Sequence, residues 1–124
     1  YKRQSEFFLN NFETSDNALD QRLKPHYYNN DYHTTQHLIT SCLNQVGFKM
    51  INVDNYYHEM LFEYKRIRVI VILNEMSLYD IRVDMKINAK YVLPLKRPIK
   101  IIAKLYEILD RKLTLKYLGG ERNE

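Results

Sequence analysis

The chain of 124 residues has little cysteine, glycine or proline, and no tryptophan. Its one cysteine, Cys42, has no partner for an internal disulfide, which excludes a disulfide framework and favours a reducing, cytoplasmic compartment. Three glycines leave few positions where the backbone can approach a phosphate closely, and the sequence has no glycine-rich phosphate loop. We therefore expect no cofactor.

Long apolar runs are missing as well. The longest, residues 69–73, has five residues, whereas a membrane helix needs about 20. The first residues lack the charged-then-apolar layout of a signal peptide. The sequence predicts no membrane span.

The composition is that of a globular protein, with 45% hydrophobic and 27% charged residues. A chain of this length forms one hydrophobic core, so two separately folded domains are not expected. We predict a single α+β domain over residues 1–124. It divides into an irregular helical N-terminal segment, 1–34, and a compact core, 35–118.

The first third of the chain has a helical but interrupted pattern. Short helices are predicted over residues 5–11 and 15–24, followed by a polar and aromatic loop over 26–32. A longer helix begins at Thr34 or Thr35 and carries apolar residues at helical spacing as far as residue 46. The next residue, Gly47, suits a left-handed C-terminal cap.

After this glycine the apolar period changes to two, which predicts strands over 48–53, 56–64, 67–74 and 78–88. The third run is apolar on both faces and suits a central strand. The fourth alternates, so its charged face is expected to be in water. Four tyrosines fall on predicted apolar faces: Tyr56, Tyr64, Tyr79 and Tyr106.

A final amphipathic helix is predicted over about 98–112, with Pro98 in its first turn. Residues 112–118 either extend this helix or form a fifth strand, and we favour the extension. The order of elements predicts an α+β two-layer sandwich, in which a mainly antiparallel four-stranded sheet packs against the C-terminal helix.

Two histidines four residues apart, His33 and His37, are the best metal-ligand candidates, because this spacing places both imidazoles on one helix face. His26 or Asp31 would have to complete the site. The helix start predicted at Thr34 or Thr35 leaves the first histidine outside the regular turns. We therefore expect solvated or hydrogen-bonded histidines and no bound metal.

The residues Asp54, Glu63 and Lys65 resemble the Asp...Glu-x-Lys arrangement of metal-dependent nucleases, in which two carboxylates bind one ion. A tight turn at residues 54–55 would separate the two carboxylates by about 25 Å along the next strand. The nuclease hypothesis therefore requires a longer unpaired stretch at 54–58.

Positive charge is concentrated near the C-terminus. Residues 1–60 hold five basic and seven acidic side chains, whereas residues 89–124 hold nine and four. A basic ridge on the last helix could bind RNA or DNA phosphates, although a solvated helix face is the ordinary alternative. The candidate nucleic-acid contacts are Lys96, Arg97, Lys100, Lys104 and Arg111.

The leading hypothesis is a small non-catalytic binding module whose partner is another protein or a second copy of the chain. Loop tyrosines offer large contact areas at low entropic cost, and charged side chains on the outer sheet face add polar contacts. If strand 78–88 lies at a sheet edge, two copies could pair through it. The candidate partner-binding residues are Tyr27, Tyr28, Tyr32, Arg82 and Lys86.

Overall fold

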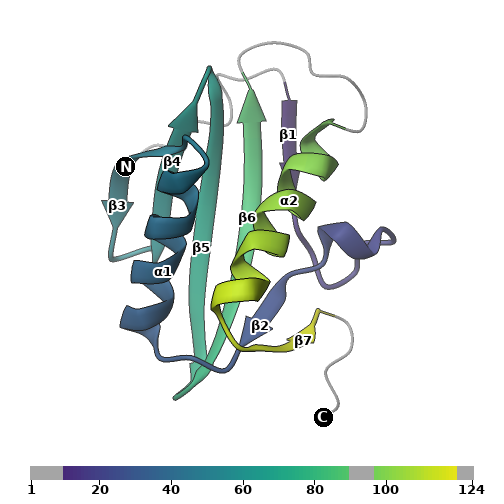
Figure 1. The fold of residues 1–124 in the computed structure, drawn as a ribbon. Helices are drawn as coiled ribbons and strands as arrows, with labels where there is room; N and C mark the ends of the chain where they lie inside the picture. Colours follow the sequence, from purple (N-terminus) through teal and green to yellow (C-terminus); the bar gives the residue numbers. More distant parts are fainter. Residues whose placement is uncertain (1–9, 90–96, 120–124) are drawn as a thin grey trace.

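The computed structural model describes residues 10–89 and 97–119, which form an α+β fold. In this part of the chain, seven strands build one antiparallel sheet, and two α-helices cover one of its faces (Figure 1). The strand order is β3-β4-β5-β6-β2-β7, and β1 also pairs with β6. The strands are β1 Asn10–Glu13, β2 His26–Tyr28, β3 Lys49–Asp54, β4 Glu59–Tyr64, β5 Ile67–Ser77, β6 Asp80–Ala89 and β7 Leu115–Leu118. The helices are α1 Tyr32–Gln45, α2 Arg97–Lys112 and the short 3₁₀ helix η2 Gln21–Leu23.

The β3–β6 meander contains the four strands predicted after Gly47, with shifted strand ends. In the hairpin between β3 and β4, Asp54 pairs with Glu59, so four residues form the turn. The Asp54 Oδ1 atom accepts hydrogen bonds from the backbone N–H groups of Tyr56 and Tyr57, at 3.0 and 3.1 Å. The predicted strand 56–64 therefore starts three residues late, and Tyr56 is 82% exposed instead of buried.

Strand β5 is covered on both faces over its first part, as its two-sided apolar pattern predicts, and it continues to Ser77. For the next strand, the condition for the pairing of two copies is not met, and the prediction of a charged face in water is wrong. Strand β6 is not an edge, because it pairs with β5 on one side and with β1 and β2 on the other. Its charged face is not in water either, since Asp84 and Lys86 are at most 9% exposed. Tyr79 lies in the turn before β6 with φ 62° and is half exposed.

The prediction of two N-terminal helices is wrong. Residues 5–9 of the first one lie outside the described residues, and Asn10–Glu13 is strand β1. The helix predicted over 15–24 shrinks to η2, one 3₁₀ turn. The loop predicted at 26–32 contains strand β2. Segment 1–34 thus contributes two strands to the sheet, because pairing with β6 overrides the local sequence preference.

The two α-helices agree closely with the predicted ones. Helix α1 begins one turn early because Asp31 is its N-cap, with its carboxylate accepting from the N–H of Thr34 at 3.2 Å. Gly47 follows the helix with φ 103°, as the cap prediction requires. Helix α2 carries Pro98 in its first turn, and residues 115–118 form β7 instead of extending it. No helix in the described ranges has the length and apolar character to cross a membrane.

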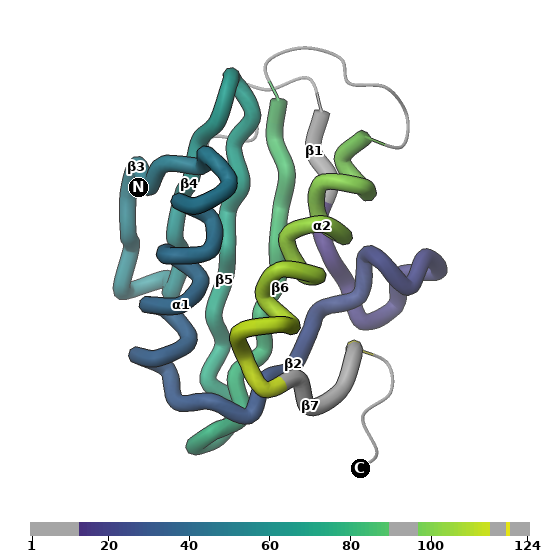
Figure 2. Tube along the Cα trace, in the orientation of Figure 1, coloured from purple at the N-terminus to yellow at the C-terminus, as the bar shows by residue number. Residues whose placement is uncertain are grey.

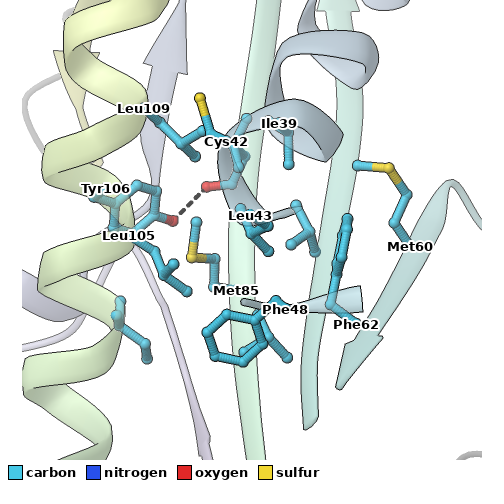
Figure 3. Close-up of a cluster of buried hydrophobic side chains, with 14 of the residues drawn as sticks. Ile39, Cys42, Leu43, Phe48, Met60, Phe62, Met85, Leu105, Tyr106 and Leu109 are labelled. Atoms are coloured by element: carbon cyan, nitrogen blue, oxygen red, sulfur yellow. Dashed lines mark hydrogen bonds between the residues drawn. The ribbon is translucent and has the colours of Figure 1, made fainter. Parts of the chain in front are cut away.

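The core lies between the sheet and the two helices, which run antiparallel to each other across it (Figure 2). Apolar side chains of β4, β5 and β6 meet those of α1 and α2 in this layer (Figure 3). Residues Ile39, Leu43, Ile102 and Leu109 are the helical contributions with almost no exposure. Burial on this scale stabilises the fold by about 1.5–3 kcal/mol for each large apolar side chain.

Candidate functional site

A groove of about 610 Å³ lies between the C-terminal end of α1 and the N-terminal half of α2. Three buried side chains, Phe48, Ile67 and Leu105, form its floor. Further apolar surface comes from side chains that are partly or largely open to solvent: Val46, Tyr64 and Ile101. Three cations complete the lining: Arg97, Lys100 and Lys104. The result is an apolar groove with a basic rim.

The turn after α1 sets the shape of one wall. The N–H of Phe48 donates back to the carbonyl of Leu43 at 3.0 Å, so the chain reverses directly into β3. The ring of Tyr64 packs against Gly47, where the β-carbon of any other residue would lie 2.9 Å from the ring. The Phe48 and Tyr64 rings are 5.5 Å apart and tilted by 56°. Glycine at this position thus supplies both the positive φ and the room for the ring.

The rim cations belong to one face of α2, because they follow one another at spacings of three and four residues. Lys104 lies 3.6 Å from Glu107, which also pairs with Arg111 at 3.1 Å. Within the described residues, Arg97 and Lys100 have no carboxylate at ion-pair distance. The first turn of α2 holds no acidic side chain. Two cations therefore stand at the positive end of the helix dipole, and no carboxylate of the described residues neutralises them.

Of the five predicted nucleic-acid contacts, the structure gathers three at the groove. Arg111 is also exposed, on the last turn of α2, and does not line the groove. Lys96 lies outside the described residues.

The predicted partner-binding residues do not form one exposed surface. The expected loop is strand β2, and its Tyr27 and Tyr28 are 2% and 0% exposed. Lys86 is 8% exposed. Tyr32, in the first turn of α1, is half-buried, with its hydroxyl 3.1 Å from Nδ1 of His58. These side chains serve the fold instead of presenting the predicted docking surface.

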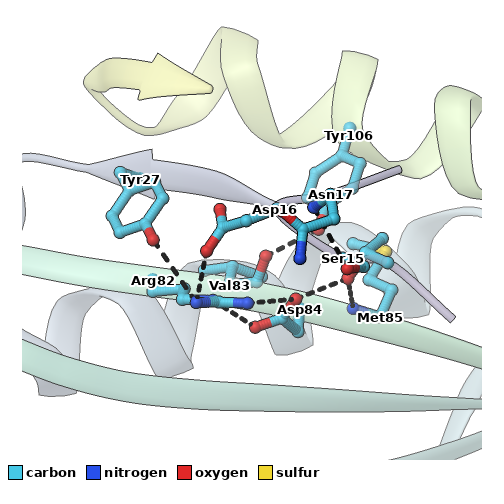
Figure 4. Close-up of polar contacts among 10 residues, drawn as sticks. Ser15, Asp16, Asn17, Tyr27, Arg82, Val83, Asp84, Met85 and Tyr106 are labelled. Carbon is cyan, nitrogen blue, oxygen red and sulfur yellow. Dashed lines mark hydrogen bonds and ion pairs between the residues drawn. The ribbon is translucent and has the colours of Figure 1, made fainter. Parts of the chain in front are cut away.

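Arg82 is part of a polar network on β6 (Figure 4). Its guanidinium forms ion pairs with Asp16 at 2.8 Å and with Asp84 at 2.7 Å. The Asp84 carboxylate also accepts from the hydroxyl of Thr14 at 2.6 Å. The network ties the segment after β1 to the middle of the sheet, and it gives the buried Asp84 carboxylate its partners.

A second polar cluster joins β2 to α2. The Asp110 carboxylate accepts from the hydroxyl of Tyr28 at 2.6 Å and lies 2.9 Å from Nδ1 of His26. The His26 ring stacks on Tyr106 with centroids 3.7 Å apart. Burial, with the help of the Asp110 carboxylate, raises the pKa of Tyr28 far above its usual range. These groups hold the helix on the sheet.

The metal and nuclease candidates are not brought together. His33 and His37 are both exposed on α1. Glu63 pairs with Lys49 and Asp54 with Glu59, so the two carboxylates lie at opposite ends of the β3–β4 hairpin. The four-residue turn does not close this separation, and Lys65 instead lies over the ring of Tyr64, 5.1 Å from its centroid. The described residues contain no cluster of three or more His, Cys, Asp or Glu able to hold a metal ion.

Cys42 faces the core from α1. The side chain is buried, and burial raises the pKa of its thiol. It packs as a small apolar residue.

Sequence reasoning finds the rim cations but misses the groove as a whole. Its apolar lining comes from the α1–β3 turn, the ends of β4 and β5, and α2, which only the tertiary fold brings together. A usable sequence signal is the pair of cations in the first turn of a helix, where acidic residues are usual. Comparisons with protein-family models, curated proteins and solved structures find no match. The site therefore has to be interpreted from its own residues.

Proposed function

We propose that this protein is a non-catalytic binding module that binds another protein at the groove between α1 and α2. The observation that carries the proposal is the apolar groove, which is open to solvent and rimmed by Arg97, Lys100 and Lys104. Contiguous exposed apolar surface with a polar rim is characteristic of interaction sites. Apolar contact and positive charge are the chemical properties that this lining supplies, and both serve binding.

Val46 is a suitable position for testing the groove. It lines the groove at the end of α1 and is 40% exposed, so a larger polar side chain there does not disturb the core. Leu19 is the matched control, because it is fully exposed in another part of the chain and does not line the groove. Val46→Glu and Leu19→Glu each replace an exposed apolar side chain with a carboxylate.

The partner is first identified by photo-crosslinking from residue 46 in the cells of origin, and is then purified. Isothermal titration calorimetry measures its Kd for the wild-type chain and for both variants, after circular dichroism has shown that both are folded. We expect Val46→Glu to weaken binding by roughly tenfold or more, because a charge inside an apolar contact costs over about 1 kcal/mol. Leu19→Glu leaves the Kd unchanged. An equal Kd for both variants would refute the groove as the binding site.

Nucleic-acid binding is the second candidate. Exposed cations along α2 favour it, among them Arg97, Lys100, Lys104 and Arg111. Phosphates bind wherever cations are accessible, whether or not apolar surface is nearby. This candidate therefore predicts that Arg111 contributes as much to affinity as Lys104. A groove ligand, in contrast, contacts only Lys104.

A further inference from the structure

From the rim of the groove we infer that its occupant is an amphipathic helix with an apolar face and an adjacent row of acidic side chains. This inference rests on the proposed function and specifies the chemistry of the partner. The inference is based on three cations that lie along one side of an apolar groove, at α2 positions 97, 100 and 104. They span eight residues of helix, or about 10 Å along its axis. A partner with a single anionic group would meet only one of them.

The placement of the cations does not serve the stability of α2. A cation at the N-terminal end of a helix opposes the helix dipole, which favours acidic side chains there. Arg97 and Lys100 stand at this end without a carboxylate at ion-pair distance among the described residues. A bound partner with carboxylates would supply the negative charge that the first turn lacks.

The shape of the groove suits a third helix. The groove lies between the C-terminal end of α1 and the N-terminal half of α2, and an amphipathic helix binds an apolar groove through side chains three and four residues apart. The solvent-accessible parts of Val46, Tyr64 and Ile101 offer the apolar contacts. Acidic side chains on the flank of the bound helix then face the cations of α2, one helical turn from the next.

The test uses three synthetic helical peptides with the same leucine face. One carries glutamate along the flank, one carries lysine and one carries glutamine. Their binding to the full chain is measured by fluorescence anisotropy at physiological salt. The chain variants are Lys104→Glu and the matched control Arg111→Glu: both residues pair with Glu107 and are exposed, but only Lys104 lines the groove.

We expect the glutamate peptide to bind the wild-type chain, and the lysine peptide not to bind. Lys104→Glu should weaken binding of the glutamate peptide by roughly tenfold, because it replaces an attraction with a repulsion. It should also give the lysine peptide measurable affinity. Arg111→Glu should change the glutamate peptide's Kd less than about twofold.

Three outcomes would overturn the inference. Equal affinity for the three peptides would show that charge does not select the occupant. Equal losses in both variants would indicate a general attraction to α2. A single-stranded oligonucleotide that displaces the glutamate peptide, with affinity falling steeply as salt rises, would assign the cations to nucleic acid.

Different results would refute the acidic helix as the occupant and the groove as a protein-binding site. If Val46→Glu weakens binding of the cellular partner while the glutamate peptide does not bind, the groove remains a protein-binding site. The inference that its occupant is an acidic helix is then wrong. If Val46→Glu and Leu19→Glu bind that partner with equal Kd, the proposed function is refuted, whatever the peptides show.

Discussion

Two buried tyrosine hydroxyls tie α2 to the sheet. The hydroxyl of Tyr28 donates to Asp110 on the helix, and the hydroxyl of Tyr106 donates to the carbonyl of Val83 on β6, each at 2.6 Å. Burial is the main cause that raises the pKa of both phenols above the ordinary value of 10, with nearby carboxylates adding to it. Both hydroxyls therefore stay protonated in the folded chain at a pH where exposed tyrosines ionise.

Stability should consequently fall above pH 10. Unfolding exposes the phenols, which then ionise at their ordinary pKa, so alkaline solution favours the unfolded state. Each phenol lowers the free energy of unfolding by about 1.4 kcal/mol for each pH unit above 10. Urea unfolding between pH 8 and pH 11 measures this slope.

The double variant Tyr28→Phe/Tyr106→Phe should lose most of the slope. Tyr56→Phe is the control, because this side chain is 82% exposed and removing its hydroxyl leaves the buried phenols in place. The raised pKa of Cys42 contributes to the trend equally in all of these proteins. An unchanged slope in the double variant would contradict the prediction.

At the scale of elements, helix α2 combines two features with opposite effects on its stability. Its buried stripe, which includes Ile102, Leu105 and Leu109, holds it on the core. Its first turn carries Arg97 and Lys100 at the positive end of the helix dipole, an arrangement that lowers helix stability. Residues that cost stability and line a groove are characteristic of binding sites.

Lys100→Glu should therefore stabilise the chain while weakening binding. A carboxylate at this position interacts favourably with the dipole, by roughly 0.3–1 kcal/mol, and adds an attraction to Lys104 four residues on. We expect a higher Tm in differential scanning calorimetry and a larger Kd for the groove ligand. Lys112→Glu, in the last turn of α2, reverses a charge at the negative end and should lower the Tm. A Tm that falls for Lys100→Glu would mean that the lysine has a structural role.

The sequence predicts those elements that carry their own periodicity. Helices α1 and α2 and strand β5 each have enough residues for an apolar pattern to repeat. Strands β1, β2 and β7 have four residues or fewer, and they exist because they pair with other strands. No local pattern distinguishes segments so short from loops.

The candidate site divides in the same way. The rim cations lie on a single helix, so they can be recognised from the sequence. Phe48, Tyr64 and Ile67 come from three different strands or turns, and only the fold makes them neighbours. The assignment of Tyr27 and Tyr28 to an exposed loop fails for the same reason, because their burial depends on the pairing of β2 with β6.

For the whole molecule, β6 is the strand on which the two parts of the sheet meet. The β3–β5 meander lies on one side of it, and β1 and β2 lie on the other (Figure 1). These N-terminal strands pair with residues that follow them by more than fifty positions. Pairing over such separations is entropically costly, so side-chain contacts have to help hold the segment in place. Arg82 provides these contacts through Asp16 and Asp84.

Arg82→Ala should therefore loosen the N-terminal segment from the sheet. It removes the partner of two carboxylates, and Asp84 is 9% exposed, so we expect a loss of about 2 kcal/mol in the free energy of unfolding. Arg22→Ala is the matched control, because this arginine also pairs with an aspartate at 2.8 Å but stands in solvent, where an ion pair contributes little. Urea unfolding compares the two variants, and hydrogen exchange locates the effect. Faster exchange at the Thr14 amide and along β2 in Arg82→Ala would support this role, since that amide donates to the carbonyl of Met85 at 2.9 Å in the intact chain. Equal stability losses in the two variants, or unchanged exchange at Thr14, would show that backbone pairing alone holds the N-terminal strands on β6.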